Sequence, residues 1–460
     1  MSDRRIFRWA TSGARVIAGT VVAVGFVVAV VTAAGVPWPS YERRPVEITA
    51  VPVPSASMLV CSGDLLALGQ IVEDPDQVVV TSSQSVVAGA EDGAMVEFVL
   101  GGPGAPRAYS KEPDGSRRFM VAASGAATAD AAFLRGYAAS ACRPPLIESW
   151  LVGGSGETGA ADIVVISNPG RVAATVELTV FGATGPEVPP GGAAIVIPAG
   201  QQHVVPLSGI ARGEASPIVR VSATGAPVTA SLQTSITRTL ATGGVDQVDA
   251  VAGPDTVQVV AGIPVMASAA AEGQVATIAR VLSPTASGTA TLTVMNARGG
   301  TPAREPQQLE LTAGLPIEVD LGGLEPGDYT VEVTADVPIL AAVWQTTGFA
   351  PGADFAWYTP APEFDGTTML AVPAGPPRTL TLVNRGDAEA LVSVSDGAQS
   401  SQTVVPPRGS TVVRVATQGL VTLESTAPVH ASLSLTGDGA LAGFPVWPAD
   451  TGSEAVVVYP

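Results

Sequence analysis

A proline-led segment that occurs three times constrains this chain more than any other feature. The copies start at Pro227, Pro338 and Pro428, and each continues with small, branched and polar residues in alternation. Such alternation predicts a β-strand, and proline is tolerated in a strand at its first position. A unit repeated three times predicts a modular β architecture.

The spacing of the copies sets the size of one module. The three prolines are separated by 338 − 227 = 111 and 428 − 338 = 90 residues, and each interval contains several short alternating runs. About 100 residues with seven short strands is the size of an immunoglobulin-like sandwich, whereas a propeller blade needs only about 40–50 residues. We therefore predict an all-β fold of tandem immunoglobulin-like β-sandwich modules after a single N-terminal transmembrane helix.

Composition supports many short strands and tight turns. The 460 residues include 51 glycines and 39 prolines, and the apolar content consists mainly of valine and alanine rather than aromatic residues. Branched residues favour strands, and glycine and proline favour turns. One helix is expected within the β region, over the alanine-rich stretch 126–137.

The N-terminal segment predicts the compartment. Residues 16–36 contain no charge, and Arg4, Arg5, Arg8 and Arg15 precede them. About 20 apolar residues cross a bilayer as a helix, and positive flanks stay in the cytoplasm. A cleaved signal peptide is the alternative, although its apolar region is usually shorter. We expect a single-pass cell-membrane protein with a cytoplasmic N-terminus and residues 37–460 outside.

The same patterns divide the chain into segments. We predict a cytoplasmic tail (1–15), a transmembrane helix (16–36), a proline-rich tether (37–57), an N-terminal β module (58–147) and three sandwich repeats (148–250, 251–360 and 361–460, the last with a tail). The N-terminal module is either a degenerate repeat or a different β fold. We expect the modules to form an extended rod.

Two cysteines, Cys61 and Cys142, bracket the N-terminal module. An even number of cysteines in an exported chain favours a disulfide, here one that closes this module. Two separate buried thiols are the alternative.

The charge of the chain excludes one class of partner. The net charge is −18, and residues 1–36 carry +3, so the remainder carries −18 − 3 = −21. An ectodomain this acidic repels nucleic acids and anionic membrane surfaces. We expect contact with the membrane through the N-terminal helix and no nucleic-acid partner.

The histidines give no catalytic pattern. His430 occupies the position that Thr229 and Leu340 hold in the other two copies of the proline-led segment, which indicates a tolerated strand position. His203 begins an apolar run and has no carboxylate nearby in sequence. A general base would need such a partner, so both histidines are interpreted as structural.

The glycine-rich stretch 154–159 matches a dinucleotide-binding pattern literally. That motif needs a helix after the glycines, and the residues that follow, 162–166, form an alternating apolar run typical of a strand. The acidic stretches 73–76 and 91–92 lack the loop spacing of a calcium site. We predict no catalytic residues, no metal site, no cofactor and no enzymatic activity.

Aromatic residues concentrate between the second and third repeats. They are Trp344, Phe355, Trp357, Tyr358 and Phe364, in a chain with only 5% aromatic residues. This cluster is the candidate recognition patch, because sugar rings and peptides pack on such side chains. A hydrophobic plug between adjacent sandwiches is the alternative.

Four short motifs, together with the single predicted span, resemble an actinobacterial family of uncharacterised, membrane-anchored proteins with a repeated extracytoplasmic β ectodomain. The motifs lie at 59–63, 141–145, 149–154 and 167–170. Ser62 departs from the proline that the family has after the first cysteine. The resemblance implies location and architecture, and it implies no activity.

Three functions remain open at this point. The first is a non-catalytic scaffold or interaction module of the cell envelope, with an envelope protein or glycan as partner. The second is a cell-wall carbohydrate-binding protein that uses the aromatic cluster. The third is a glycan-active enzyme whose acid pair comes from distant modules, since two carboxylates suffice for glycoside cleavage.

Overall fold

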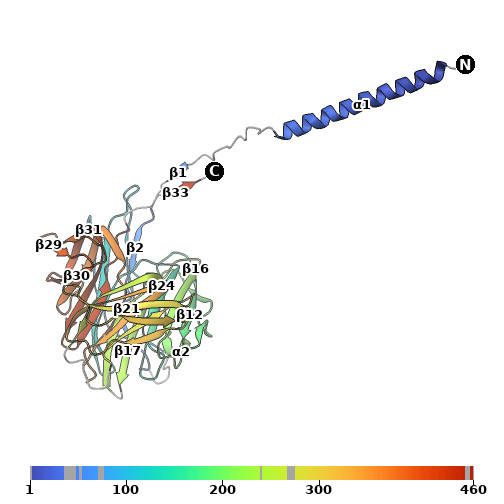
Figure 1. The fold of residues 1–460 in the computed structure, drawn as a ribbon. Coiled ribbons are helices and arrows are strands. Elements are labelled where there is room, and N and C mark those ends of the chain that lie inside the picture. Colours follow the sequence, from blue (N-terminus) through green and yellow to red (C-terminus); the bar gives the residue numbers. More distant parts are fainter. Residues whose placement is uncertain are drawn as a thin grey trace. The chain divides into compact units, whose positions relative to one another are not determined.

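The computed structural model describes residues 3–35, 48–50, 54–70, 77–238, 241–266, 275–450 and 456–458. They fall into two compact units, one of residues 1–52 with 454–460 and one of residues 53–453 (Figure 1). Most of the predicted tether and the acidic stretch 73–76 lie outside the described residues.

The first unit contains the long helix α1 (Asp3–Gly35). Its segment Gly13–Gly35 is long and apolar enough to cross a membrane, a property that a signal sequence shares. A two-stranded sheet follows, in which β1 (Ile48–Ala50) pairs antiparallel with β33 (Val456–Val458). The end of the chain therefore pairs with the segment after the helix.

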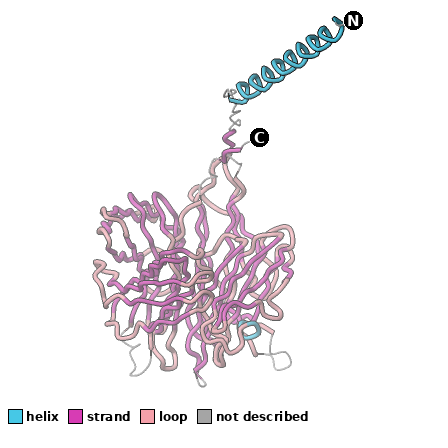
Figure 2. Tube along the Cα trace, turned by 45° about the vertical axis from the view of Figure 1, so that its right-hand side comes forward, coloured by secondary structure: helices cyan, strands magenta, loops and turns pink. Residues whose placement is uncertain are grey.

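The second unit confirms the all-β prediction (Figure 2). Repeat 1 has two antiparallel sheets, in the orders β10-β16-β12-β13, with β14 also on β12, and β15-β11-β17-β18. Its strands are β10 (Glu148–Val152), β11 (Ile163–Asn168), β12 (Ala174–Gly182), β13 (Gly185–Glu187), β14 (Ile195–Ile197), β15 (Gln201–Pro206), β16 (Ile218–Thr224), β17 (Thr229–Arg238) and β18 (Ala241–Asp249). One short helical turn, α2 (Leu207–Ile210), follows β15.

Repeats 2 and 3 have the same strand order as repeat 1. In each of them, however, a single long strand takes the places of β16 and β17 and so belongs to both halves of the repeat. Repeat 2 comprises β19 (Asp255–Val265), β20 (Thr277–Leu282), β21 (Gly288–Asn296), β22 (Gln307–Leu311), β23 (Ile317–Asp320), the long β24 (Gly327–Thr346) and β25 (Phe355–Tyr358). Repeat 3 comprises β26 (Glu363–Val372), β27 (Arg378–Asn384), β28 (Ala390–Ser395), β29 (Ser400–Val405), β30 (Gly409–Val415), the long β31 (Gly419–Gly437) and β32 (Ala440–Pro445).

The repeated proline marks the point at which the chain changes sheets. Pro227 lies between β16 and β17, as the sequence predicts. Pro338 and Pro428 lie inside β24 and β31, so the expected strand start is wrong for these two copies. In β24, pairing with β21 ends at Ala335 and pairing with β20 begins at Leu340. Proline fits this gap because its missing N–H removes no ladder hydrogen bond.

Repeats 1 and 3 have the same asparagine corner. Asn168 accepts a hydrogen bond from Gly170 N and donates to the carbonyls of Val172 and Ile197. Asn384 makes the same three bonds, with Gly386, Ala388 and Val405. The side-chain amide thus satisfies backbone groups that the turn leaves unpaired.

The N-terminal module is built from three small sheets, β2-β7-β6, β3-β4 and β5-β8-β9. Their strands are β2 (Ser57–Val60), β3 (Leu65–Ala67), β4 (Val79–Ser82), β5 (Ser85–Ala90), β6 (Val96–Val99), β7 (Arg107–Lys111), β8 (Val121–Ala131) and β9 (Leu134–Ala141). A disulfide joins Cys61 to Cys142, as the sequence predicts.

The expected helix over 126–137 is wrong, because these residues form the hairpin β8–β9. Alanine favours a helix in isolation, but tertiary packing overrides that preference. The buried side chains on β8 are mostly alanines, and small side chains allow neighbouring elements to approach this sheet closely.

The modules do not form the expected rod. The outermost strands β9, β18, β25 and β32, one from each module, pack against one another in the centre of the second unit. The first and last modules are therefore in contact. An edge strand buried in this way has backbone N–H groups without a neighbouring strand, and these groups need other acceptors.

Asp354 supplies acceptors at this junction. It is 0% exposed and accepts hydrogen bonds from Tyr137 N of β9 (2.9 Å), Val245 N of β18 (3.2 Å) and Leu441 N of β32 (3.1 Å). One carboxylate thus joins strands of all four modules. A Cβ at Gly136 or Gly244, both at positive φ, would lie within 2.6 Å of its Oδ1, so glycine is required beside it.

Candidate functional site

The strongest candidate site is a cleft of about 400 Å³ between repeats 1 and 2, here called the aromatic cleft. Its walls come from the glycine-rich loop 154–162, the end of β17, strands β20 and β23, and three aromatic side chains. These aromatic residues are Trp344 of β24 and Phe355 and Trp357 of β25.

The predicted aromatic cluster is divided by the fold. All five side chains are buried, and none is more than 8% exposed, so they do not form an exposed patch. Trp344, Phe355 and Trp357 extend the core of repeat 1, as the alternative of a plug between sandwiches requires. Tyr358 lies in the core of repeat 2 and Phe364 in that of repeat 3. Only the first three reach the cleft.

The glycine-rich loop forms the rim of the cleft and connects β10 to β11 without a helix. A Cβ at Gly156 would collide with the carbonyl oxygen of Ala211, and one at Gly154 would lie 2.7 Å from Asp162 Oδ2. The glycines are therefore explained by close packing of the loop, as predicted for a turn between strands.

Asp162 holds this loop in place. It is 3% exposed, and its two carboxylate oxygens accept hydrogen bonds from Ser155 N (2.7 Å) and Ser235 N (2.8 Å). Burial raises the pKa of Asp162 to about 7, because desolvation outweighs the two N–H groups and the nearby Arg280.

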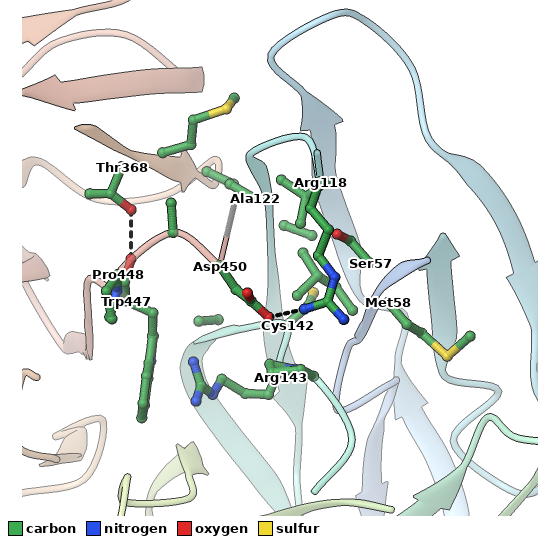
Figure 3. A pocket seen from close by; sticks show the side chains of 18 of the residues that line it. Ser57, Met58, Arg118, Ala122, Cys142, Arg143, Thr368, Trp447, Pro448 and Asp450 are labelled. Carbon is green, nitrogen blue, oxygen red and sulfur yellow. Dashed lines mark hydrogen bonds and ion pairs between the residues drawn. The ribbon is translucent and has the colours of Figure 1, made fainter. Parts of the chain in front are cut away.

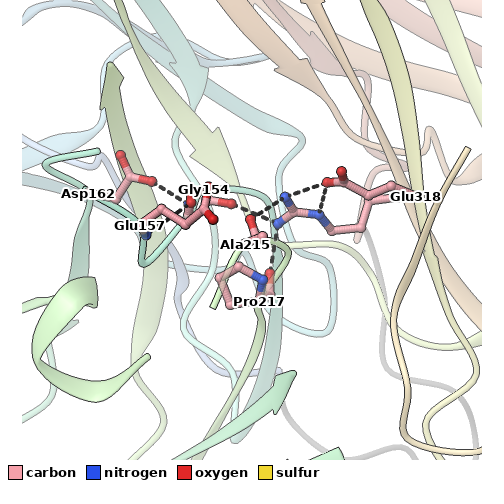
Figure 4. A network of polar contacts seen from close by, with 8 residues as sticks. Gly154, Glu157, Asp162, Ala215, Pro217 and Glu318 are labelled. Atoms are coloured by element: carbon pink, nitrogen blue, oxygen red, sulfur yellow. Dashed lines mark hydrogen bonds and ion pairs between the residues drawn. The ribbon is translucent and has the colours of Figure 1, made fainter. Parts of the chain in front are cut away.

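Arg280 of β20 connects the two repeats (Figure 4). It is 2% exposed, and its Nη1 donates to the carbonyl oxygens of Gly154 and Pro217, each at 2.8 Å. Its Nε and Nη2 donate to Glu318 Oε1, at 3.1 and 2.8 Å. Its guanidinium also lies 4.6 Å from the centre of the Trp357 ring. Every nitrogen of this side chain is engaged by protein atoms.

Two polar groups in the cleft remain without a protein partner. Thr234 is 1% exposed, and its hydroxyl has no hydrogen-bond partner among the described residues. Arg238 Nη1 also lacks one, although its guanidinium lies 5.1 Å from the Phe349 ring centre. In the cleft, hydrogen-bonding groups without a protein partner therefore lie beside the apolar surface of three aromatic side chains.

The two histidines lie away from the aromatic cleft. His203 is exposed on β15. His430 is 8% exposed on β31, where its Nδ1 donates to Ala361 O at 2.8 Å and its Nε2 lies 3.9 Å from Glu363 Oε1. Burial lowers the pKa of His430, which favours the neutral ring. Among the described residues, no group of three metal-binding side chains comes together.

Sequence reasoning missed Arg280 and the buried aspartates of the junction. Arg280 is the one charged residue in an otherwise mainly apolar strand. A charge at an inward-facing position of such a strand is the sequence signal that could have identified Arg280. Asp246 and Asp249 follow the buried Val245 and Val248 in β18, a strand with other polar residues, where the signal is weaker. Asp246 accepts a hydrogen bond from Trp357 N and Asp249 accepts one from Ala141 N.

Residues 101–421 match a family of unknown function designated DUF5719, so the chain belongs to that family. The match includes the aromatic cleft and most of the junction around Asp354, but not Leu441 of β32. No curated protein matches the chain.

Proposed function

We propose that this member of the DUF5719 family is a membrane-anchored, extracytoplasmic protein that acts as a non-catalytic scaffold or interaction module in the cell envelope. The apolar helix near the N-terminus supports the anchor, and the disulfide is typical of exported domains. The acidic ectodomain favours protein or glycan partners over nucleic acids.

The engagement of two carboxylates in the aromatic cleft, Asp162 and Glu318, is the observation that carries the non-catalytic part of the proposal. Asp162 and Glu318 come from different repeats, as the enzyme hypothesis requires. Asp162, however, is bound to two backbone amides, and Glu318 is bound to Arg280. A general acid or base needs a proton position that faces substrate. Cleavage of a cell-wall glycan that disappears in Asp162→Asn would overturn this part.

Strand β6 supports an interaction role. It is the outermost strand of its sheet, and its Val96 and Val99 are 67% and 59% exposed. An open strand edge with apolar side chains accepts an extended segment of another protein through backbone hydrogen bonds. We therefore assign to β6 an extended segment of an envelope protein as its partner.

Site-specific photocrosslinking in the intact envelope tests this role. A photoreactive amino acid at position 96 should yield one discrete crosslinked protein, because its side chain would lie beside side chains of the added strand on the same face of the sheet. The same probe at position 172, an exposed valine in a turn, is the matched control. Loss of the product in Val99→Lys supports the proposal, whereas identical products from both positions contradict it.

Location needs its own experiment. Protease added to intact cells should degrade residues 53–453 and leave a short membrane-bound N-terminal fragment. Mass measurement of the mature N-terminus distinguishes a retained helix from a cleaved leader. A mature chain that begins after Gly35 would replace the anchored form with a secreted one.

Glycan binding is the second candidate function, because Trp344, Trp357 and Thr234 line the same cleft. A ligand that binds only the folded state raises the unfolding temperature. Cell-wall glycan fragments should therefore raise it in the wild type and not in Trp344→Ala. The absence of a shift with every fragment tested removes this candidate.

A further inference from the structure

A second cavity, of about 460 Å³, lies where the N-terminal module meets repeat 3, and it is here called the seam pocket (Figure 3). Its walls come from residues 55–59, 118–119, 121–123, 141–146, 368–371 and 444–450, with Pro227 of repeat 1. Pockets for small molecules usually measure about 300–1,000 Å³, so the seam pocket is large enough for a ligand of that size.

The walls of the seam pocket are mainly apolar. They include Met58, Leu59, Leu146, Met369 and Phe444. These side chains come from three strands and a loop of two different modules, and they enclose a space that the protein itself does not fill. Apolar surface of this kind binds hydrocarbon, because its transfer from water is favourable.

Two of the three aromatic rings at the pocket, Phe119 and Trp447, have a cation over a face. The Arg143 guanidinium lies over the Trp447 ring, and Lys111 and Arg117 lie over Phe119. A sugar ring would have to displace these cations to stack on the faces they cover, whereas a hydrocarbon chain needs no open aromatic face. The chemistry of the seam pocket differs from that of the aromatic cleft.

Two of the three charged side chains in the pocket neutralise each other. Arg118 forms an ion pair with Asp450, and it also donates to Ser55 O (3.0 Å) and Ser55 Oγ (2.8 Å). Figure 3 shows this pair beside the chain segment that carries Trp447. The pair fastens the C-terminal segment over the pocket and leaves neither charge free for a ligand.

Arg143 is the remaining charge. Its half-buried guanidinium makes no hydrogen bond or ion pair with any described residue, although the buried Asp249 attracts it from a longer distance. In a chain with a net charge of −18, a half-buried arginine without an acidic partner in contact is unusual. Such a group stabilises an anion strongly, because charge-assisted hydrogen bonds gain strength where water is scarce.

We propose that the seam pocket binds an anionic amphiphile, with its carboxylate or phosphate on Arg143 and its acyl chain along the apolar walls. A free fatty acid and a membrane phospholipid share this chemistry. The proposal does not depend on the function of the aromatic cleft or of β6.

Fluorescence quenching of the full-length protein in phosphatidylcholine nanodiscs tests the proposal. The probes are dibromostearate, its methyl ester, and a phosphatidic acid with the same brominated chain. Bromine quenches tryptophan at short range, so the signal of the pocket is the difference between the wild type and Trp447→Phe. Subtracting the quenching seen in Trp447→Phe removes the part that comes from the other tryptophans and from probe dissolved in the bilayer.

We expect at least one anionic probe to quench Trp447 and the methyl ester to do so at least tenfold more weakly. Arg143→Gln should weaken the anionic probe by at least tenfold, whereas Arg171→Gln, at an exposed position, should leave it unchanged. Quenching by the fatty acid alone identifies a free acid as the ligand, and quenching by the phosphatidic acid alone identifies a lipid.

A second variant protects the test if Arg143→Gln does not fold. Met369→Trp places a larger side chain in the pocket and should abolish binding of both anionic probes while the disulfide stays intact. Binding to this variant is measured by titration calorimetry against empty nanodiscs, because the added tryptophan would itself be quenched. Equal quenching in the wild type and Trp447→Phe would overturn the proposal. Equal affinity for the acid and its ester would also overturn it, as would full binding by Met369→Trp.

Discussion

The central junction and the seam pocket both join modules, and they do so by opposite means. At the junction, Asp354 fills the space between four strands with hydrogen bonds and is fully buried. At the seam, Arg118 and the 70% exposed Asp450 hold two modules together across an unfilled cavity. The junction is therefore built for stability, and the seam keeps space for a ligand at the expense of packing.

The largest effect should come from removing the Asp354 carboxylate. Asp354→Ala leaves at least three buried N–H groups without acceptors, and each such group costs about 1–3 kcal/mol. We expect a loss of about 4–6 kcal/mol in the free energy of unfolding, measured by urea titration. Asp354→Asn keeps one acceptor oxygen and should lose less. A loss below about 1 kcal/mol for Asp354→Ala would contradict the junction's role.

The disulfide on the seam side should rank second. It closes a loop of 81 residues, for which the chain-entropy model gives about 4–5 kcal/mol. Replacement of both Cys61 and Cys142 by serine should lower the free energy of unfolding by up to this amount. An unchanged value would mean that the surrounding strands already hold the module closed.

The junction should also make stability depend on pH. Burial raises the pKa of Asp249 and Asp354 to about 7, and that of Asp246 well above its ordinary value. The folded protein then keeps protons that the unfolded chain releases near pH 4. The stability that comes from these bound protons is therefore fully present below pH 4 and is lost as the pH rises through 7. The unfolding temperature should be lower at pH 8 than at pH 5.5.

Asp249→Asn sharpens this test, because the amide cannot ionise and Asp249 Oδ1 has no hydrogen-bond partner to lose among the described residues. Its unfolding temperature should change less between pH 5.5 and 8 than that of the wild type. The same change at the exposed Asp387, Asp387→Asn, is the matched control and should leave the profile as it is. A wild-type protein that becomes more stable as the pH rises would contradict the raised pKa values.

The smallest effect should come from the seam ion pair. Asp450→Asn removes an exposed partner of Arg118, and surface ion pairs contribute about 0–1 kcal/mol. We expect a change below about 1 kcal/mol in the free energy of unfolding. A loss as large as that of Asp354→Ala would erase the contrast between seam and junction.

Much of the fold follows from local sequence. Alternation of branched and polar residues is enough to predict the strands, because side chains point to opposite faces in turn. The copies at Pro227, Pro338 and Pro428 predict three related modules, and the two cysteines predict the disulfide. The candidate site could be predicted only in part. Trp344, Phe355 and Trp357 were found from sequence, but their burial and their division from Tyr358 and Phe364 were not.

Sequence by itself determined the strands, the repeats and the apolar helix, because each depends on residues that are close together in the chain. Tertiary structure decided that an alanine-rich stretch becomes a hairpin, that the modules meet around Asp354, and that Arg143 lies over Trp447 beside an unfilled cavity, without a hydrogen bond from its guanidinium to any described residue. The reason is that these features depend on which edge strands meet, and Tyr137 and Leu441 reach the same carboxylate from more than 300 residues apart. No local pattern carries that information.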